Sequence, residues 1–383
     1  MSRKLWSISI LLLVNVCAFA QVQNGKLQIH HIDRGQADAG VLISPNGEVV
    51  LFDMGEDMKR KECQTAIAYL DQLGIQHVDY IFVSHYHFDH IGCIPAVLKR
   101  FPLTKTAYDR GHDYNGTTYT DYVAAVGSHR KEANVGTTVQ LDQGSANPVT
   151  LTVIAVNGDS KHGHVVTTNE NDLSLGVLVS FGAFREEISG DLSGDNTSMY
   201  QDVETPVAPE VGEIDVYKVH HHCSSHSTNN TWLADTKPTI AVISTGDGNS
   251  YGHPAEDCVT RLHEAALKKV YWTERGAGAT PEDGFDVIAG DVNIEVAPGA
   301  TSYTVSHEGA TPDSYQTKLS TRGESQQAPA PTATPKKFAW SKRSTVYHDA
   351  SCPDVKRILK ENLVEGDTPP RDKTPASCVK GVQ

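Results

Sequence analysis

The stretch that decides the fold reads Val78-Asp79-Tyr80-Ile81-Phe82-Val83 followed by Ser84-His85-Tyr86-His87-Phe88-Asp89-His90. The first six residues are mostly apolar, which predicts a short strand buried on both faces. Three imidazoles and one carboxylate follow at once, and such groups can converge on divalent cations. A solvated polar loop is the alternative. The strand followed by a loop is the setting that a metal motif requires, and it favours a metal site.

Two further polar clusters also follow apolar segments. Asp191 lies in Ser189-Gly190-Asp191, after an apolar hairpin, where it is suited to bridging two cations. The run Lys218 to His226 contains four histidines and follows a predicted strand at 214–219. A lone histidine tract can be a surface metal scavenger. Three clusters at the ends of three predicted strands instead indicate one shared site.

Apolar runs alternate with turn residues along most of the chain, which predicts an α/β protein whose sheets are covered by helices. A hairpin turn is expected at Pro45-Asn46-Gly47. We found no internal repeat. Strands are expected at 27–32, 40–43, 49–52, 78–83, 151–156, 173–181, 214–219, 239–244 and 269–272, and helices at 58–73, 118–133 and 255–267.

The chain has 383 residues and a net charge of −14, a composition typical of a soluble globular protein. Residues 1–20 have a basic start, an apolar centre and a small-residue ending, which predicts a signal peptide and export to the periplasm or the exterior. An uncleaved anchor is the alternative, and no membrane span is expected after cleavage. The acidic balance disfavours nucleic acid as an avidly bound partner without excluding it. The sequence does not indicate an oligomeric state.

Three segments are expected after the signal peptide. They are a main domain at 21–308, a Pro-rich flexible linker at 309–337 and a small module at 338–383. The module is short for a self-sufficient core, so a Cys352–Cys378 disulfide, or zinc held by these cysteines with His348, is expected there. Six cysteines follow the signal peptide and allow 15 pairings, and the sequence does not choose between them.

A series of motifs in a fixed order resembles the metallo-β-lactamase superfamily, and within it the hydrolase domain of competence DNA-uptake channel proteins (ComEC-like). The resemblance covers about Leu27 to Val305 and implies a four-layer αβ/βα sandwich with the site along one edge. The motifs are Ile32–Ala39, Leu51–Gly55, His85–His90, Asn171–Ser174, Gly190-Asp191, His221-His222 and Asn249–Pro254.

The resemblance also implies the roles of individual side chains. The metal ligands would be His85 and His87 for one cation, Asp89 and His90 for the other, Asp191 between them, and His222 on the second. Asp89, His221 and His253 would be catalytic, and Asn171, His221 and His253 would contact substrate. Asp53 would support the ligand loop, although a strand-end turn residue is an alternative for it, as a structural turn histidine is for His253.

The chain departs from the family pattern in two places. Cys223-Ser224 stands where the family usually has Gly-Ser after the paired histidines, and His220 is an additional histidine before them. Many members supply a further histidine ligand between the first two clusters. His162 and His164 lie in that interval and are candidates, but neither is required.

The implied activity is metal-dependent hydrolysis. Two cations about 3.5–4 Å apart can hold a hydroxide at neutral pH and neutralise transition-state oxygens. The ligand set suits two divalent ions, with zinc preferred and manganese or iron as alternatives. The resemblance favours phosphodiesters, either nucleic acid or phosphorylcholine-type esters. The alternatives are a β-lactam or lactone hydrolase and, from another class, a non-catalytic metalloprotein that binds the cell envelope.

Overall fold

The computed structural model describes residues 24–56 and 63–318 and parts of 338–376. The signal peptide predicted at 1–20 lies outside these residues. The chain divides into two compact units, residues 1–322 and 323–383, each described here by itself. Among the described helices, none has the length and apolar character needed to cross a bilayer.

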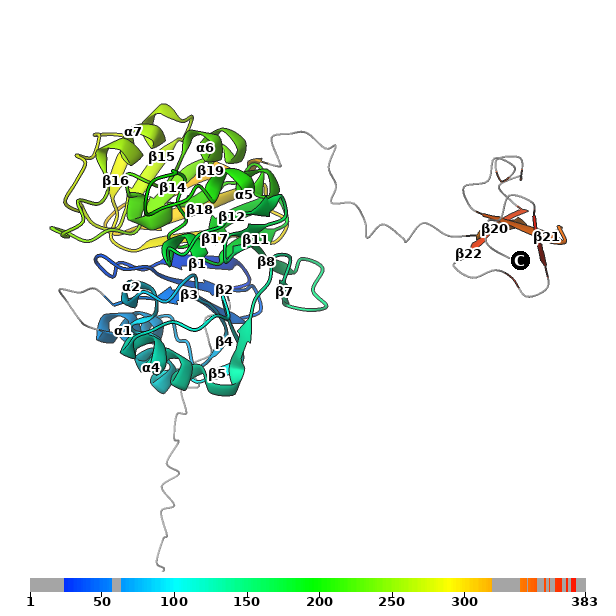
Figure 1. Ribbon diagram of the computed structural model, residues 1–383, viewed down its shortest axis with the longest axis horizontal. Coiled ribbons are helices and arrows are strands. Elements are labelled where there is room, and N and C mark those ends of the chain that lie inside the picture. The colour runs from blue at the N-terminus through cyan, green and yellow to red at the C-terminus, as the bar shows by residue number, and fades with distance from the viewer. Residues whose placement is uncertain are drawn as a thin grey trace, which may run out of the picture. The chain divides into compact units, whose positions relative to one another are not determined.

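The first sheet of unit 1 has nine strands and contains the strand that precedes the histidine loop (Figure 1). It is antiparallel from β19 to β3 and parallel from β3 to β6. The order is β19 (Asp313–Gln316), β18 (Ser302–His307), β17 (Val292–Val296), β1 (Leu27–His31), β2 (Ala39–Ile43), β3 (Val49–Met54), β4 (Val78–Phe82), β5 (Leu103–Asp109) and β6 (Arg130–Glu132).

The second sheet has ten strands and is parallel from β12 to β16. The order is β10 (Gly163–His164), β9 (Asp159–Ser160), β8 (Val149–Val156), β11 (Gly176–Phe181), β12 (Phe184–Ile188), β13 (Val216–Lys218), β14 (Ile240–Ile243), β15 (Lys269–Trp272) and β16 (Asp286–Ile288), and β7 (Thr138–Leu141) pairs with β8.

Helices cover the outer face of each sheet, so the unit has four layers, αβ/βα (Figure 1). Apolar side chains of the two sheets meet in a central core, and each sheet forms a second core with its helices. The predicted α/β sandwich is confirmed. The first sheet packs on α1 (Cys63–Gln72), α2 (Phe88–Ile91), α3 (Ile94–Arg100) and α4 (Thr117–Val126), and the second on α5 (Glu204–Val211), α6 (Asn230–Thr236) and α7 (Glu256–Glu264). The 3₁₀ turns are η1 (Gly127–His129), η2 (Asn171–Leu173) and η3 (His220–Cys223).

Several predicted boundaries are wrong, among them the end of the helix predicted at 255–267, which lies at Glu264. The helix predicted at 118–133 ends at Val126, because Gly127 has a positive φ of 51° and Arg130 then enters β6, where it pairs with buried Asp109 at 2.6 Å. The strand predicted at 173–181 begins at Gly176, after η2. The predicted linker begins too early, since β19 lies within it. This polar edge strand has no apolar pattern, and Tyr271 and Lys269 hold it by hydrogen bonds to Asp313.

Two disulfides join segments of unit 1: Cys63–Cys93 and Cys223–Cys258. Unit 2 is a four-stranded sheet in the order β22 (Leu363–Gly366), β20 (Phe338–Ser341), β21 (Val346–Asp349) and β23 (Thr374–Pro375). His348 lies on β21, paired with Ala339. Cys352 and Cys378 lie outside the described residues, so their disulfide or zinc site stays a prediction.

Candidate metal centre

The candidate site lies where several parallel strands end. Asp53 is the penultimate residue of β3, and the His85–His90 loop follows β4. Asp191 follows β12, and His221 and His222 follow β13. The carboxyl ends of neighbouring parallel strands lie on one edge of a sheet, so Asp53 and the histidine loop meet at the edge of the first sheet, and Asp191 and the paired histidines meet at the edge of the second. Contacts between His90 and Asp191 show that the two edges adjoin at the site.

The histidine loop is fixed from beneath by Asp53. Its carboxylate accepts hydrogen bonds from the Ser84 backbone N–H (2.8 Å), the Ser84 hydroxyl (2.7 Å) and His90 Nδ1 (2.8 Å). Gly55 lets the loop approach β3, because a Cβ there would lie 1.7 Å from the Asp89 carbonyl oxygen. His90 therefore presents its other nitrogen, Nε2, toward the site, and Asp53 contacts the loop as a supporting residue would, while its role toward a metal stays a prediction.

Asp191 stands at the centre of the predicted ligands. Its carboxylate oxygens lie 3.3 Å from His90 Nε2, 3.8 Å from His85 Nε2 and 3.9 Å from His222 Nε2. His85, His90, Asp191 and His222 are all at most 2% exposed. Asp191 therefore reaches both halves of the predicted ligand set, as a bridging carboxylate must.

The remaining predicted ligands complete two neighbouring groups. Asp89 Oδ2 lies 3.6 Å from His222 Nε2, and these two residues form one candidate group with His90. His87 Nδ1 lies 3.0 Å from His85 Nε2, close enough for both nitrogens to bind one ion. His85, His90 and Asp191 form a second group. All six predicted ligands thus lie together, while their division between two ions stays a prediction.

Burial and mutual charge set the ionisation of this centre. Burial alone would raise the pKa of Asp191, but His90, His221 and His222 outweigh it and hold the pKa well below its ordinary value. Burial alone would lower the pKa of His90, yet Asp191 and Asp53 raise it well above its ordinary value. The imidazoliums compensate the carboxylates here in the way that a bound cation would.

Unpaired buried atoms test whether a cation fits. His90 Nε2, Asp191 Oδ1 and His222 Nε2 are buried without a hydrogen-bond partner among the residues that the structure describes. Such atoms are costly unless something binds them. Imidazole nitrogens and carboxylate oxygens are ordinary ligands of zinc and manganese. The donor set therefore fits a divalent metal.

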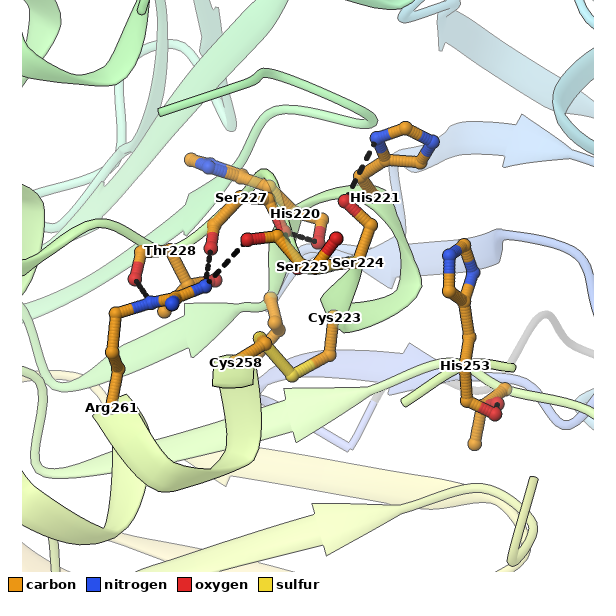
Figure 2. Close-up of a disulfide and its surroundings, with 12 residues drawn as sticks. His220, His221, Cys223, Ser224, Ser225, Ser227, Thr228, His253, Cys258 and Arg261 are labelled. Atoms are coloured by element: carbon orange, nitrogen blue, oxygen red, sulfur yellow. Dashed lines mark hydrogen bonds between the residues drawn. A yellow bond between two sulfur atoms is a disulfide. The ribbon is translucent and has the colours of Figure 1, made fainter. Parts of the chain in front are cut away.

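The two adjacent histidines face different partners. His222 Nδ1 donates to the Ser244 carbonyl at 3.0 Å, which turns Nε2 toward the metal ligands. His221 Nε2 lies 3.0 Å from Asn171 Nδ2. His221 Nδ1 lies 3.3 Å from the Ser224 hydroxyl (Figure 2). Burial lowers the pKa of His221 to about 4. Asp191 opposes this change, and the charge of His222 adds to it.

A cavity of about 490 Å³ opens over these groups. The predicted substrate residues Asn171, His221 and His253 line it, together with the aromatic rings of Phe88, Tyr200 and Tyr251. Phe88 belongs to the His85–His90 loop and Tyr251 to the Asn249–Pro254 segment that carries His253, whereas Tyr200 lies in a segment that no sequence motif marked.

The tautomer of His253 follows from its neighbour Gln36. The amide oxygen of Gln36 accepts a hydrogen bond from the Gly246 backbone N–H at 3.1 Å, which fixes the orientation of the amide. The amide nitrogen of Gln36 therefore lies 3.3 Å from His253 Nδ1 and can only donate to it. His253 Nδ1 therefore accepts, and the ring proton is on Nε2. Burial, together with His222 and His221, lowers the pKa of His253 to about 3. His253 is a neutral hydrogen-bond donor in this state.

Two candidates lie away from the centre. His162 and His164 are exposed, and His164 Nδ1 pairs with Asp159 at 2.8 Å. Neither belongs to the clusters of three or more ligands found among the described residues. In this structure, neither histidine supplies a further ligand from the segment between the first two clusters.

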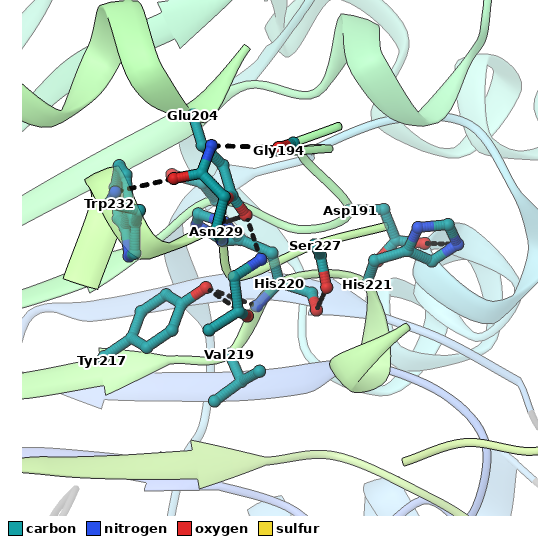
Figure 3. A network of polar contacts seen from close by, with 12 residues as sticks. Asp191, Gly194, Glu204, Tyr217, Val219, His220, His221, Ser227, Asn229 and Trp232 are labelled. Atoms are coloured by element: carbon teal, nitrogen blue, oxygen red, sulfur yellow. Dashed lines mark hydrogen bonds and ion pairs between the residues drawn. The ribbon is translucent and has the colours of Figure 1, made fainter. Parts of the chain in front are cut away.

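Two buried networks around the site were missed. Lys218 Nζ lies 2.8 Å from Asp38, which also lies 3.6 Å from His222 Nδ1. His220 is fully buried, and its Nδ1 lies 2.8 Å from Glu204 (Figure 3). Its Nε2 lies 3.2 Å from Glu187. The only signal in the sequence was that Lys218 and His220 flank a strand end beside the paired histidines.

The fold and the buried His/Asp centre together define a metallohydrolase of the αβ/βα type. The sequence profile of the Metallo-beta-lactamase superfamily matches residues 32–247, and the chain belongs to this superfamily.

The similar proteins include two curated relatives. "Recombination protein 2" of Haemophilus influenzae is 27% identical over 256 residues, 66% of this chain and 29% of the relative. "ComE operon protein 3" of Bacillus subtilis is 23% identical over 265 residues, 65% of this chain and 32% of the relative. The chain thus matches less than a third of the length of either, and the predicted resemblance to competence proteins is confirmed as a distant one.

Solved structures also resemble the chain. The metallo-beta-lactamase fold protein YhfI from Bacillus subtilis is 13% identical, with 67% of this chain and 99% of that chain covered and a TM-score of 0.37. A metallo-beta-lactamase of Cronobacter sakazakii is 16% identical, with 49% and 72% covered and a TM-score of 0.33.

Proposed function

We propose that this chain is an exported, metal-dependent phosphodiesterase with two divalent cations, zinc or manganese, in its centre. The observation that carries the proposal is the set of unpaired buried atoms on His90, Asp191 and His222, which face one another at 3.3–3.9 Å. When bound, a cation pair supplies an activated water and charge neutralisation for phosphoryl oxygens. The chain's own residues position the substrate against it.

His253 and His221 have complementary tasks in this proposal. His253 donates a hydrogen bond from Nε2 to a phosphoryl or leaving oxygen, because Gln36 fixes its tautomer. His221 is neutral near pH 7, since its pKa is about 4, and Asn171 and Ser224 fix its ring. It lines the cavity beside Asp191 and orients the scissile group.

The aromatic rim favours a phosphodiester with a flat ring beside the phosphate. Tyr251 is 52% exposed and stacks on His253 with ring centroids 5.7 Å apart, and Tyr200 stacks on His226 at 4.8 Å. Exposed aromatic faces bind nucleobases by stacking. The name of the relative "Recombination protein 2" agrees with a nucleic-acid substrate. The acidic net charge favours short strands or strand ends over avid binding of long polyanions.

Export is part of the same proposal. Two disulfides within unit 1 are consistent with an oxidising compartment, and the first 20 residues have the pattern of a signal peptide.

The test is a substrate screen on the purified chain loaded with Mn²⁺ or Zn²⁺. The substrates are bis-p-nitrophenyl phosphate, a single-stranded oligonucleotide, p-nitrophenyl phosphorylcholine, a lactone and a β-lactam. We expect diester cleavage by the wild type and by Asp121→Asn, a matched change at an exposed carboxylate of α4, and none by Asp191→Asn. Equal, metal-independent rates for all three proteins would remove the hydrolase assignment. β-Lactam turnover without diester cleavage would replace the phosphodiester by the alternative substrate.

A further inference from the structure

The paired histidines stand on an unusual stretch of backbone. His221, His222 and Cys223 have φ values of 49°, 51° and 60°, three consecutive side-chain-bearing residues in the left-handed region. L-residues disfavour this region, and it is normally visited by single residues. Such a run persists only where the surroundings enforce it. Both the predicted metal ligand His222 and the substrate-facing His221 depend on it for their directions.

Helix α7 contacts this run through a covalent bond. Cys223 is disulfide-bonded to Cys258 in the first turn of α7 (Figure 2). The carbonyl oxygen of Cys223 also accepts a hydrogen bond of 2.8 Å from the Ala255 backbone N–H, just before the helix. The third left-handed residue is thus bound to α7 through both its side chain and its main chain.

Arg261, one turn further along α7, holds the segment that follows. Its guanidinium donates to the carbonyl oxygens of Ser225 (3.0 Å), Ser227 (2.9 Å) and Thr228 (2.8 Å) (Figure 2). Cys258 and Arg261 are three residues apart, so they lie on the same face of α7.

The same helix is continuous with the segment that carries His253. His253 and Pro254 immediately precede Ala255, and the His253 ring centroid lies 5.7 Å from that of His221 and 6.1 Å from that of His222. The disulfide therefore ties the two histidine-bearing segments of the cavity to one rigid element.

We propose that Cys223, Cys258 and Arg261, which we call the α7 clamp, are positioning residues for the metal centre. The clamp holds the left-handed run so that His222 reaches the cation shared with Asp89 and His90, and so that His221 and His253 face the substrate together. The proposal rests on the proposed function as a two-metal hydrolase. It also gives Cys223 a role at a position with a φ of 60°, which glycine would adopt without strain.

The test compares metal affinity and kinetics in variants of the full chain. Cys223→Ser/Cys258→Ala removes the disulfide, and Cys223→Gly/Cys258→Ala removes it while relieving the backbone at position 223. We expect the serine variant to bind one of its two Co²⁺ ions about 10- to 100-fold more weakly, with altered Co²⁺ absorption and a lower kcat. The glycine variant should recover much of both, which a merely stabilising disulfide would not explain.

Two controls separate the clamp from general damage. Cys63→Ser/Cys93→Ser removes the other disulfide and should retain the wild-type Co²⁺ affinity, because α2 and Asp53 hold His90 independently. Arg261→Ala keeps the disulfide intact and should lower the affinity for the same Co²⁺ ion. Wild-type Co²⁺ affinity in both Cys223→Ser/Cys258→Ala and Arg261→Ala would overturn the proposal. Equal losses of Co²⁺ affinity in Cys223→Ser/Cys258→Ala and Cys63→Ser/Cys93→Ser would overturn it too. Co²⁺ affinity is measured without substrate. Failure of the protein to cleave diesters would therefore contradict the proposed function but not the α7 clamp.

Discussion

Replacing His220 by glutamine should destabilise the protein in a manner that depends on pH. His220 is fully buried, and its ring nitrogens lie 2.8 Å from Glu204 and 3.2 Å from Glu187. Burial alone would lower the pKa of His220, but the two carboxylates outweigh it and raise the pKa from 6.5 to about 9. His220 is therefore an imidazolium that neutralises a buried acidic pair at neutral pH.

The magnitude and its sign follow from this pKa. A rise from 6.5 to about 9 corresponds to about 3 kcal/mol of folding free energy. Because the folded-state pKa is the higher one, this stabilisation is fully present below pH 6.5 and is lost as the pH rises to 9. His220→Gln leaves two buried carboxylates without their cation, which costs about 3–5 kcal/mol at pH 6. The cost should shrink by about 3 kcal/mol at pH 9 and above.

The assay is urea unfolding of both proteins with intact disulfides and with a chelator present, since bound metal would add its own stabilisation. The difference in unfolding free energy between the two proteins removes titrations that they share, such as those of His90 and His222. His112→Gln, a change at an exposed histidine, is the matched control and should show no pH-dependent difference. A His220→Gln cost that is the same at pH 6 and pH 9 would refute the charge assignment.

Two further predictions concern the site itself. Asp53→Asn should weaken metal binding about 10- to 100-fold, because the carboxylate that orients His90 is lost, and competition with a fluorescent chelator measures it. Unchanged affinity would show that His90 needs no such support. Tyr251→Ala should raise the KM for a dinucleotide about 5- to 100-fold with little change in kcat, if the ring stacks on a base. Steady-state kinetics decide, and an unchanged KM would contradict the stacking role.

The sequence predicted the parts of the fold that repeat a simple pattern. Val78–Val83 and Ile214–Val219 are apolar runs, and both became buried strands that end at the site. Polar edge strands such as β19 lack such a pattern and were interpreted as linker. The helix predicted at 118–133 is present as α4, but it ends at Val126, because tertiary pairing of Arg130 with Asp109 overrides local helix propensity beyond it.

That the candidate ligands lie together could be predicted because they stand in short clusters at strand ends, but the buried residues that support them could not. The Lys218–Asp38 hydrogen bond joins residues 180 positions apart, and nothing local marks either of them as buried. Nothing in the sequence around Glu187 and Glu204 marks them as buried, although both are fully buried around His220. Only the tertiary fold shows which charges have been taken out of water and paired.

The central claim is that Asp191 bridges two cations held by His85, His87, Asp89, His90 and His222. Crystals grown with Mn²⁺ or Zn²⁺ test it directly through anomalous scattering. The account predicts two anomalous peaks, one on each side of the Asp191 carboxylate, each about 2.0–2.2 Å from its imidazole nitrogens and carboxylate oxygens. Anomalous density elsewhere on the chain, with none beside Asp191, would contradict it.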